Sequence, residues 1–290
     1  MNSDAPTVVV LGSVNMDLVT STERRPTRGE TVLGSGFATV PGGKGANQAI
    51  AAARSGARVR FLGATGDDAF GETLRTTLSE AGVDITLLRR VDGASGVATI
   101  VVDESGDNSI IVVTGANGRM TELTPTELAT IAAADILLCQ LEIPVDTVVE
   151  AARRARASGT VVALNPSPVR PLPGELWAAV DVAIVNTLEF EQFRTELAQV
   201  PHVVRTLGEE GALYRGADGT ELAVAGLPVD VVDTTGAGDA FTGALLATWR
   251  QGVDTAVKWA NIAGALATTR PGASASIPGW EEIETIRRSS

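Results

Sequence analysis

Short apolar runs alternate with amphipathic segments along most of this chain. Four of the runs are almost wholly apolar and end at a glycine, an asparagine or a carboxylate: TVVVLGS, ADILLCQLE, TVVALNP and VAIVN. Strands that are apolar throughout are typical of parallel sheets, because helices cover both faces of such sheets. After the second run, Val145, Val148 and Val149 follow helical spacing. The alternation predicts an α/β fold with a mostly parallel sheet and right-handed crossovers.

Two segments depart from this alternation. Residues 15–41 and 95–115 mix β-forming runs with turn residues and show no helical period, which predicts antiparallel strands. Residues 103–108 supply a turn between two runs rich in valine and isoleucine. In VATIVV both alternating faces are apolar, so each face needs a cover. We expect a single α/β domain over residues 1–290, with these two segments forming a small, discontinuous β lid. Helices are predicted near residues 68–81, 237–251 and 254–269.

Charge and composition exclude several classes of function. The formal net charge of −12 argues against a nucleic-acid partner, since binding nucleic acid depends on basic patches. The apolar runs are shorter than the roughly 18 to 20 residues of a membrane helix, and the N-terminus lacks the basic region of a signal peptide. We therefore expect a soluble, cytoplasmic protein without a membrane partner. The lone cysteine, Cys139, is predicted to be a core thiol, and the lone histidine, His202, to be structural, which leaves no Ser-His-Asp triad.

Polar residues at strand ends are the first candidates for a binding site, because open α/β sheets bind ligands there. Asn15 and Asp17 follow the first strand and fit either hydroxyl groups of a ligand or a simple turn. PGGKGANQA places Lys44 and Asn47 after two glycines and favours binding, although it is not a Walker A loop. Glu142 ends an apolar strand, where an ordinary surface carboxylate is the simpler interpretation when it is taken alone.

Two further loops each allow two interpretations. Asn186 and Glu189 are three residues apart, as in a pair that faces a metal-bound phosphate or in a helix capping box. Thr206, Gly208 and Gly211 allow the backbone to turn around a nucleotide or to form a plain turn.

The stretch DTTGAGDAFTG carries the strongest chemical signal. Phe241 stands where a dinucleotide fingerprint needs its last glycine, so a Rossmann site is excluded. Gly236 and Gly238 at a helix start instead let a phosphate approach unpaired N–H groups. Asp239 is either a helix cap or, beside anionic phosphates, a general base.

Together, GSVNMD, PGGKGANQA, TGDDAFGE, NPSP, NTLE, TLGEEG and DTTGAGDAF resemble, in this order, the ribokinase group of the carbohydrate kinase family, across essentially the whole chain. The resemblance implies a three-layer α/β/α core with a β lid, and transfer of the ATP γ-phosphate to the ribose 5-hydroxyl. It implies that Asp239 is the base and that Gly236, Ala237 and Gly238 form the anion hole.

The resemblance also assigns ligand-binding positions. The implied sugar-binding residues are Asn15, Met16, Asp17, Gly43, Lys44, Gly45, Ala46, Asn47, Glu142 and Asp239. The implied nucleotide-binding residues are Asn186, Thr206, Leu207, Gly208, Glu209, Glu210, Gly211, Gly238 and Asn261. Glu189 is expected to orient Mg²⁺ through water. A monovalent cation, K⁺, is expected near Asp233, Thr235, Ala267, Arg270, Gly272 and Ser276.

The chain departs from the family pattern in two places. Pro271 lies within the expected cation loop, and the interval between Glu189 and Thr206 is short enough to predict a missing helix. Lids in this family also clasp a second subunit, so the resemblance implies a homodimer. The alternatives are a related kinase of another sugar or of a nucleoside, and a sugar-binding regulator without catalysis.

Overall fold

The protein was analysed as a computed structural model that describes residues 5–105 and 107–289. Its main layer is a nine-stranded sheet with the order β13-β12-β11-β10-β9-β8-β1-β4-β5. All neighbours from β5 to β11 are parallel, whereas β12 and β13 join antiparallel. The strands are β1 (Thr7–Leu11), β4 (Arg58–Gly66), β5 (Leu88–Val91), β8 (Ile136–Cys139), β9 (Val161–Leu164), β10 (Val182–Val185), β11 (His202–Thr206), β12 (Gly211–Arg215) and β13 (Glu221–Ala225).

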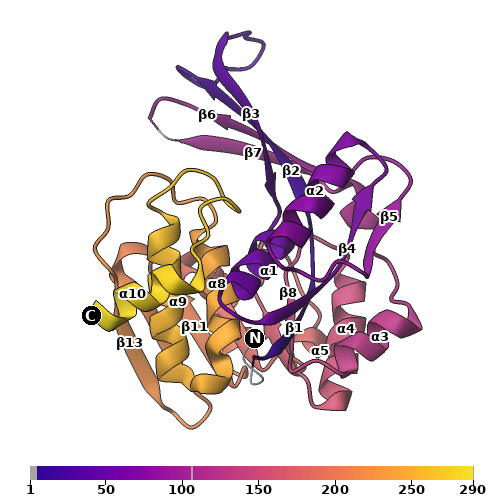
Figure 1. Cartoon of the computed structure of the whole chain (residues 1–290), viewed down its shortest axis with the longest axis vertical. Coiled ribbons are helices and arrows are strands. Elements are labelled where there is room, and N and C mark those ends of the chain that lie inside the picture. Colours follow the sequence, from indigo (N-terminus) through magenta and orange to yellow (C-terminus); the bar gives the residue numbers. More distant parts are fainter. Residues whose placement is uncertain (1–4, 106, 290) are drawn as a thin grey trace.

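Helices cover both faces of this sheet (Figure 1). Alternate residues of β1 enter different cores: Val8 and Val10 pack on one side, and Val9 and Leu11 on the other. The first side is covered by α1 (Lys44–Arg54), α2 (Ala69–Glu80), α8 (Ala237–Thr248) and α9 (Val253–Ala267), with α10 (Trp280–Ser289) outside α9. The second side is covered by α3 (Pro125–Ala132), α4 (Val145–Ser158), α5 (Gly174–Trp177), α6 (Thr187–Gln192) and α7 (Arg194–Leu197). The predicted three-layer fold is confirmed.

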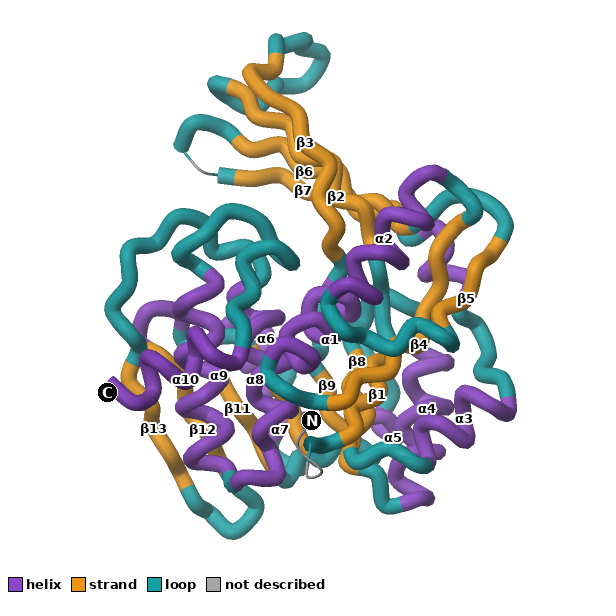
Figure 2. The backbone as a smooth tube through the Cα atoms, in the orientation of Figure 1, coloured by secondary structure: helices purple, strands orange, loops and turns teal. Residues whose placement is uncertain are grey.

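A second sheet projects away from these layers (Figure 2). Its strands, in the order β3-β2-β6-β7, are β2 (Asn15–Thr22), β3 (Gly34–Gly42), β6 (Gly96–Val102) and β7 (Asn108–Val113). We call it the small sheet. The sequence predicts a cover for each of its faces, but Ile111 and Val113 of β7 are 68% and 57% exposed in the single chain. The small sheet therefore presents uncovered apolar side chains.

The helix predictions agree with the structure. The segment predicted at residues 237–251 is α8 followed by the 3₁₀ turn η3 (Trp249–Gln251), and two more 3₁₀ turns are η1 (Gly115–Arg119) and η2 (Gly208–Glu210). The short interval between Glu189 and Thr206, which predicts a missing helix, contains the four-residue α7, and α7 buries Leu197 in the core. The turn predicted at residues 103–108 joins β6 to β7, although residue 106 lies outside the described residues.

The predictions for the lone cysteine and the lone histidine have structural counterparts. Within residues 5–105 and 107–289, no helix has the length and apolar character needed to cross a membrane. Cys139 is buried in β8, and its burial raises the pKa of the thiol, as expected of an inert core cysteine. His202 stacks on Tyr214, and its Nδ1 lies 2.7 Å from the tyrosine hydroxyl, which is a structural contact.

Candidate active site

The strand order reverses at β1, which pairs with β8 on one side and with β4 on the other. In open α/β sheets such a point creates a crevice at the carboxyl ends of the strands. Glu142 follows β8, Asn165 follows β9 and Asn186 follows β10. The fold thus brings polar side chains from three loops to one edge of the sheet.

Two glycines bring the start of α1 against the end of β1. Gly43 has a φ of 91°, and a Cβ atom on it would lie 2.8 Å from Asn15 N. A Cβ atom on Gly45 would lie 2.6 Å from Ser13 N. Only glycine allows such approaches of backbone to backbone. They bring the start of β2, with Asn15 and Asp17, beside Lys44 and Asn47. The implied sugar-binding residues Met16 and Ala46 bury their side chains in the core, so only their backbone is available to a ligand.

Asp239 is 8% exposed and turns toward α1 rather than toward solvent. Its Oδ2 accepts a hydrogen bond from Asn47 Nδ2 at 3.0 Å, and its Oδ1 accepts one from Gln48 Nε2 at 2.8 Å. α8 has no side-chain hydrogen bond at its N-cap, so Asp239 does not cap its own helix. The sequence leaves open whether Asp239 is a helix cap or a general base, and the structure does not show a helix cap. The carboxylate is held in the interior of the crevice.

The backbone at the start of α8 carries free donors beside this carboxylate. Gly236 is the N-cap residue with a φ of 79°, a left-handed conformation that glycine adopts without strain. Within the described part of the chain, the amides of Gly236, Gly238 and Asp239 have no acceptor, whereas Ala237 N donates to Thr234 O at 3.3 Å. Unpaired amides at a helix N-terminus form a site for an anion.

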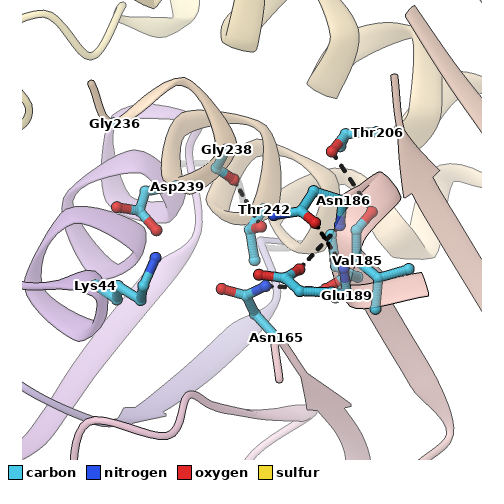
Figure 3. A pocket seen from close by; sticks show the side chains of 11 residues that line it. Lys44, Asn165, Val185, Asn186, Glu189, Thr206, Gly236, Gly238, Asp239 and Thr242 are labelled. Carbon is cyan, nitrogen blue, oxygen red and sulfur yellow. Dashed lines mark hydrogen bonds between the residues drawn. The ribbon is translucent and has the colours of Figure 1, made fainter. Parts of the chain in front are cut away.

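Four carboxyl groups and one lysine surround the crevice. Burial, together with the nearby charges of Glu142 and Asp239, raises the pKa of Asp17 to about 7. Burial acts to lower the pKa of Lys44, but Asp239, Glu142 and Glu189 outweigh it and the pKa is raised. The Lys44 side chain extends toward Asp239 (Figure 3). The lysine therefore stays charged and offsets the carboxylates.

Glu142 and Asn47 show what the crevice offers to hydroxyl groups. Glu142 Oε2 accepts hydrogen bonds from Ser13 Oγ and, at 3.1 Å, from Lys44 N, so Glu142 is not a free surface carboxylate. Asn47 Oδ1 is buried and has no hydrogen-bond partner among the described residues. Because a buried unpaired acceptor is costly, this atom suits the hydroxyl of a ligand. Asn15 Oδ1 is already occupied, since it accepts from Asn117 Nδ2 at 2.7 Å.

Two adjoining cavities lead away from Asp239. The smaller one, of about 130 Å³, runs from Lys44 and Asp239 to Asn186 and Glu189 (Figure 3). The larger one, of about 800 Å³, shares Thr206 and Gly238 with the first. Its remaining lining comes mainly from Gly208, Glu209, Gly211, Leu227, Pro228, Val229, Val231, Phe241, Asn261, Gly264, Ala265 and Thr268. Its apolar walls and its volume suit a nucleotide base, and the smaller polar cavity suits phosphates.

Some predicted nucleotide residues have structural partners of their own. Asn186 and Glu189 form a complete capping box on α6, with hydrogen bonds of 2.8 and 2.9 Å, while both also line the smaller cavity. Asn261 Nδ2 donates to Ala225 O, which ties α9 to β13. Leu207 N donates to Gly211 O. Leu207 and Glu210 do not line either cavity.

The predicted cation residues come from two segments, one before α8 and one at the end of α9 and after it, which Asp233 joins by a hydrogen bond. Asp233 Oδ1 accepts from Thr235 N, and its Oδ2 accepts from Gly272 N, both at 2.9 Å. Arg270 pairs instead with Glu282 of α10. Ser276 is buried and donates to Ala273 O, and Ala267 ends α9. The described residues contain no cluster of three His, Cys, Asp or Glu side chains able to hold a metal by themselves. A cation here would depend on backbone carbonyls.

The sequence analysis missed several residues of the site. Gln48 bonds Asp239, Gln140 bonds Gln48, and Asn165 and Thr242 line the smaller cavity. Asn165 carried the same signal as Asn186, namely a polar residue directly after a buried strand. Gln48 directly follows Asn47 in the motif, but nothing in its spacing indicates which way it points.

Comparisons with known proteins agree with this arrangement. The model of the pfkB family carbohydrate kinases matches residues 5–280. Ribokinase of Bacillus subtilis is 39% identical, over 96% of this chain and 98% of the relative. A deoxyribokinase of Salmonella typhimurium is 34% identical, over 95% and 97%. The solved structure of Arabidopsis thaliana ribokinase complexed with ribose and ATP superimposes with a TM-score of 0.91 and 31% identity, covering 99% of this chain and 100% of the other.

Proposed function

Since the chain belongs to the pfkB family of carbohydrate kinases, we propose that it transfers the γ-phosphate of ATP to the 5-hydroxyl of D-ribose. The products are D-ribose 5-phosphate and ADP. The observation that carries this proposal is the position of Asp239, a buried carboxylate held beside free amides where two adjoining cavities meet. A hydroxyl acceptor, a base and an anion site are what phosphoryl transfer to an alcohol requires.

The chemistry follows from these groups. Asp239 takes the proton of the 5-hydroxyl while the oxygen forms a bond to the γ-phosphorus and the bond from that phosphorus to the bridging oxygen of ADP breaks. Negative charge grows on the transferred group during this step. The fixed N–H groups at the start of α8 and the ammonium of Lys44 stabilise that charge without having to reorganise. Gly236, Ala237 and Gly238 would act through their backbone.

The sugar would lie between the main body and the small sheet, which we propose acts as a lid. A polyol needs hydrogen-bond donors and acceptors, and these are supplied by Asp17, Lys44, Asn47 and Glu142. Asn47 Oδ1 has no hydrogen-bond partner among the described residues, so it is free to accept one from the sugar. Asn15, Gly43 and Gly45 would shape the same pocket. Closure of a lid would exclude water and protect ATP from hydrolysis.

ATP would occupy the two cavities with its base in the larger one, lined by Gly208, Gly211 and Asn261. Mg²⁺ would be held through water by Asn186 and Glu189, whose oxygen atoms fit a hard cation, and it would supply positive charge that offsets the charge of the phosphates. K⁺ would bind the loop held by Asp233, close to the start of α8. Dependence on cellular ATP supports a cytoplasmic location.

The substrate is tested by measuring ADP formation from MgATP with D-ribose, 2-deoxyribose, fructose and adenosine, in potassium and in sodium buffer. We expect the highest kcat/KM with ribose, and stimulation by potassium. If Asp17 and Asn47 bind adjacent hydroxyls, 2-deoxyribose is a poor substrate, because a site that pairs a hydroxyl strongly rejects an analogue without it.

Because the chain is 34% identical to a deoxyribokinase, 2-deoxyribose is the most important alternative substrate to test. Preference for it, or for fructose or adenosine, would leave the phosphoryl-transfer chemistry standing and refute the assignment of ribose. No turnover with any acceptor would favour a sugar-binding regulator.

A further inference from the structure

A chain of buried amide side chains ends on Asp239. Gln48 of α1 and Gln140, directly after β8, are both completely buried. Gln140 Nε2 donates to Gln48 Oε1 at 2.6 Å, and Gln48 Nε2 donates to Asp239 Oδ1 at 2.8 Å. Gln48 Nε2 also donates to Asn165 Oδ1 at 3.0 Å. Every polar atom of the Gln48 side chain is therefore committed to a protein partner.

The orientation of each side-chain amide follows from neighbouring groups that can only accept hydrogen bonds. Asp239 is a carboxylate, so Gln48 presents its nitrogen to it and its oxygen to Gln140. Asn165 Nδ2 donates to the carbonyl of Ile184, so Asn165 Oδ1 faces Gln48. Gln140 thus donates to Gln48, and Gln48 donates to Asp239. Such a chain is polarised toward the carboxylate and holds it more firmly than a single bond does.

The protein maintains this chain at a cost. Gln140 Oε1 is buried and has no hydrogen-bond partner among the described residues, an unfavourable state for an amide oxygen. A Cβ atom on Gly12 would lie 2.0 Å from that same atom, so glycine at position 12 leaves room for it. A leucine or methionine at position 140 would avoid the unpaired oxygen. Retaining glutamine there makes sense if the orientation of Gln48 matters.

The two oxygen atoms of Asp239 are held differently. Oδ1 is held by Gln48, which has no free polar atom for a ligand. Among the residues that the structure describes, Oδ2 is held by Asn47 alone. The Oδ1 atom of Asn47 has no partner among them either, and Asn47 belongs to the proposed sugar pocket. Binding of a hydroxyl at Asn47 thus brings the acceptor beside Oδ2. Oδ1 stays in place.

We propose that Gln48 is a positioning residue for the reaction: it fixes Asp239 Oδ1, so that Oδ2 is the atom that takes the proton from the sugar hydroxyl. This inference rests on the proposed kinase function. Gln48 itself touches no reacting atom, and its contribution passes entirely through the carboxylate.

The test replaces Gln48 with methionine, which has a similar length and no hydrogen-bonding amide. In Gln48→Met we expect kcat to fall about 10- to 100-fold, a part of the 10²- to 10⁴-fold that a positioned base contributes. KM for ribose should change by less than about threefold, because a residue that acts only on the base does not alter ground-state binding. Gln140→Met keeps both direct bonds to Asp239, so its loss of kcat should be smaller.

A double-mutant cycle separates positioning from a structural role. In the Asp239→Asn background, Gln48→Met should cause no further loss of kcat, because the group through which it acts is gone. A full additional loss in that background would overturn the proposal, as would unchanged kcat in Gln48→Met. A loss in Gln140→Met as large as in Gln48→Met would also contradict it.

If Gln48→Met does not fold, Gln48→Glu provides a second test of the proposal. A protonated glutamic acid can donate to Asp239 as the amide does, whereas an ionised one repels it. We therefore expect kcat of this variant to fall as pH rises, unlike that of the unmodified enzyme. Asp17, Lys44, Glu142 and Glu189, the charged groups around the crevice, are the same in both proteins. Equal pH profiles would refute the positioning role, whereas an unmodified enzyme inactive on ribose would instead refute the proposed function.

Discussion

The carboxyl group of Asp17 is the one in the crevice whose proton affinity is most disturbed. Burial and two neighbouring carboxylates raise its pKa to about 7. If the ionised form accepts hydrogen bonds from ribose hydroxyls, protons compete with the sugar below pH 7. We expect kcat/KM for ribose to fall as pH is lowered from 8 to 6, with a midpoint near 7, since kcat/KM reports groups of the free enzyme.

The matched control for that titration is Asp17→Asn, which keeps the shape of the side chain and cannot ionise. Its affinity for ribose should be weaker, but the step near pH 7 should be absent from its profile. A step of the same size in the variant would assign the titration to another group and remove Asp17 from the account.

At this scale the sequence singled out Asp239 and its neighbours, which the structure brings together, but not the residues that hold Asp239 in place. Asp239 was recognisable because glycines and a helix start surround it within a few residues. Gln48 and Asn165 were not, because their partners are distant: 191 residues separate Gln48 from Asp239, and 117 separate it from Asn165. Local spacing carries no information about such contacts.

Among the elements, the contact between α1 and α8 matters most for the site, because α1 carries Asn47 and Gln48 and α8 carries Asp239. Gly243 makes this contact close. A Cβ atom on it would lie 2.4 Å from Ala51 Cβ and 2.5 Å from Gln48 O. Any side chain there pushes α1 away from α8 and loosens both hydrogen bonds to Asp239.

We expect Gly243→Ala to destabilise the protein by about 1–3 kcal/mol, as overpacking does, and to lower kcat at the same time. Thermal unfolding and steady-state kinetics measure the two effects. Gly174→Ala is the control, since a Cβ atom there has no neighbour within 4 Å and its φ is not positive. Wild-type stability and turnover in Gly243→Ala would contradict the close packing described here.

Individual helices and strands could be predicted from the sequence where the pattern of apolar residues was long enough. α4 and α8 were predicted from helical spacing or from a glycine-marked start, and β1 and β10 from unbroken apolar runs. α7 was not, because its four residues are too few to show a period, and distant contacts hold it in place: Leu197 is buried and its carbonyl accepts a hydrogen bond from Arg215. Packing against the rest of the protein, and not the local sequence pattern, therefore determines that α7 forms.

On the scale of the whole molecule, the small sheet leaves apolar surface without a partner in the chain. Phe37 is 69% exposed, Ile111 68% and Val113 57%, all on β3 and β7. Large apolar side chains that are exposed on both edge strands of one sheet are typical of an interface. This supports the proposal that two copies clasp each other through the small sheet.

Light scattering at micromolar concentration tests this proposal, and the expected mass is that of a dimer. Ile111→Asp places a charge in the proposed interface and should give monomers that remain folded, because Ile111 makes little contact within its own chain. A monodisperse monomer from the unmodified protein would refute the dimer.

The order of the strands in the sheet could not be predicted from the sequence. Alternation predicted a parallel sheet with helices on both faces, yet nothing local shows that β1 lies between β8 and β4 or that β12 and β13 extend the sheet antiparallel. That order creates the crevice in which residues from distant loops meet.

The central claim is that Asp239 is the base of an ATP-dependent sugar kinase, and the most direct measurement is kcat for ribose in Asp239→Asn. The amide keeps the size of the side chain but cannot take the proton. We expect kcat to fall by several orders of magnitude, about 10²- to 10⁴-fold or more, with the melting temperature unchanged within a few degrees. Turnover equal to that of the unmodified protein would show that Asp239 is not the base.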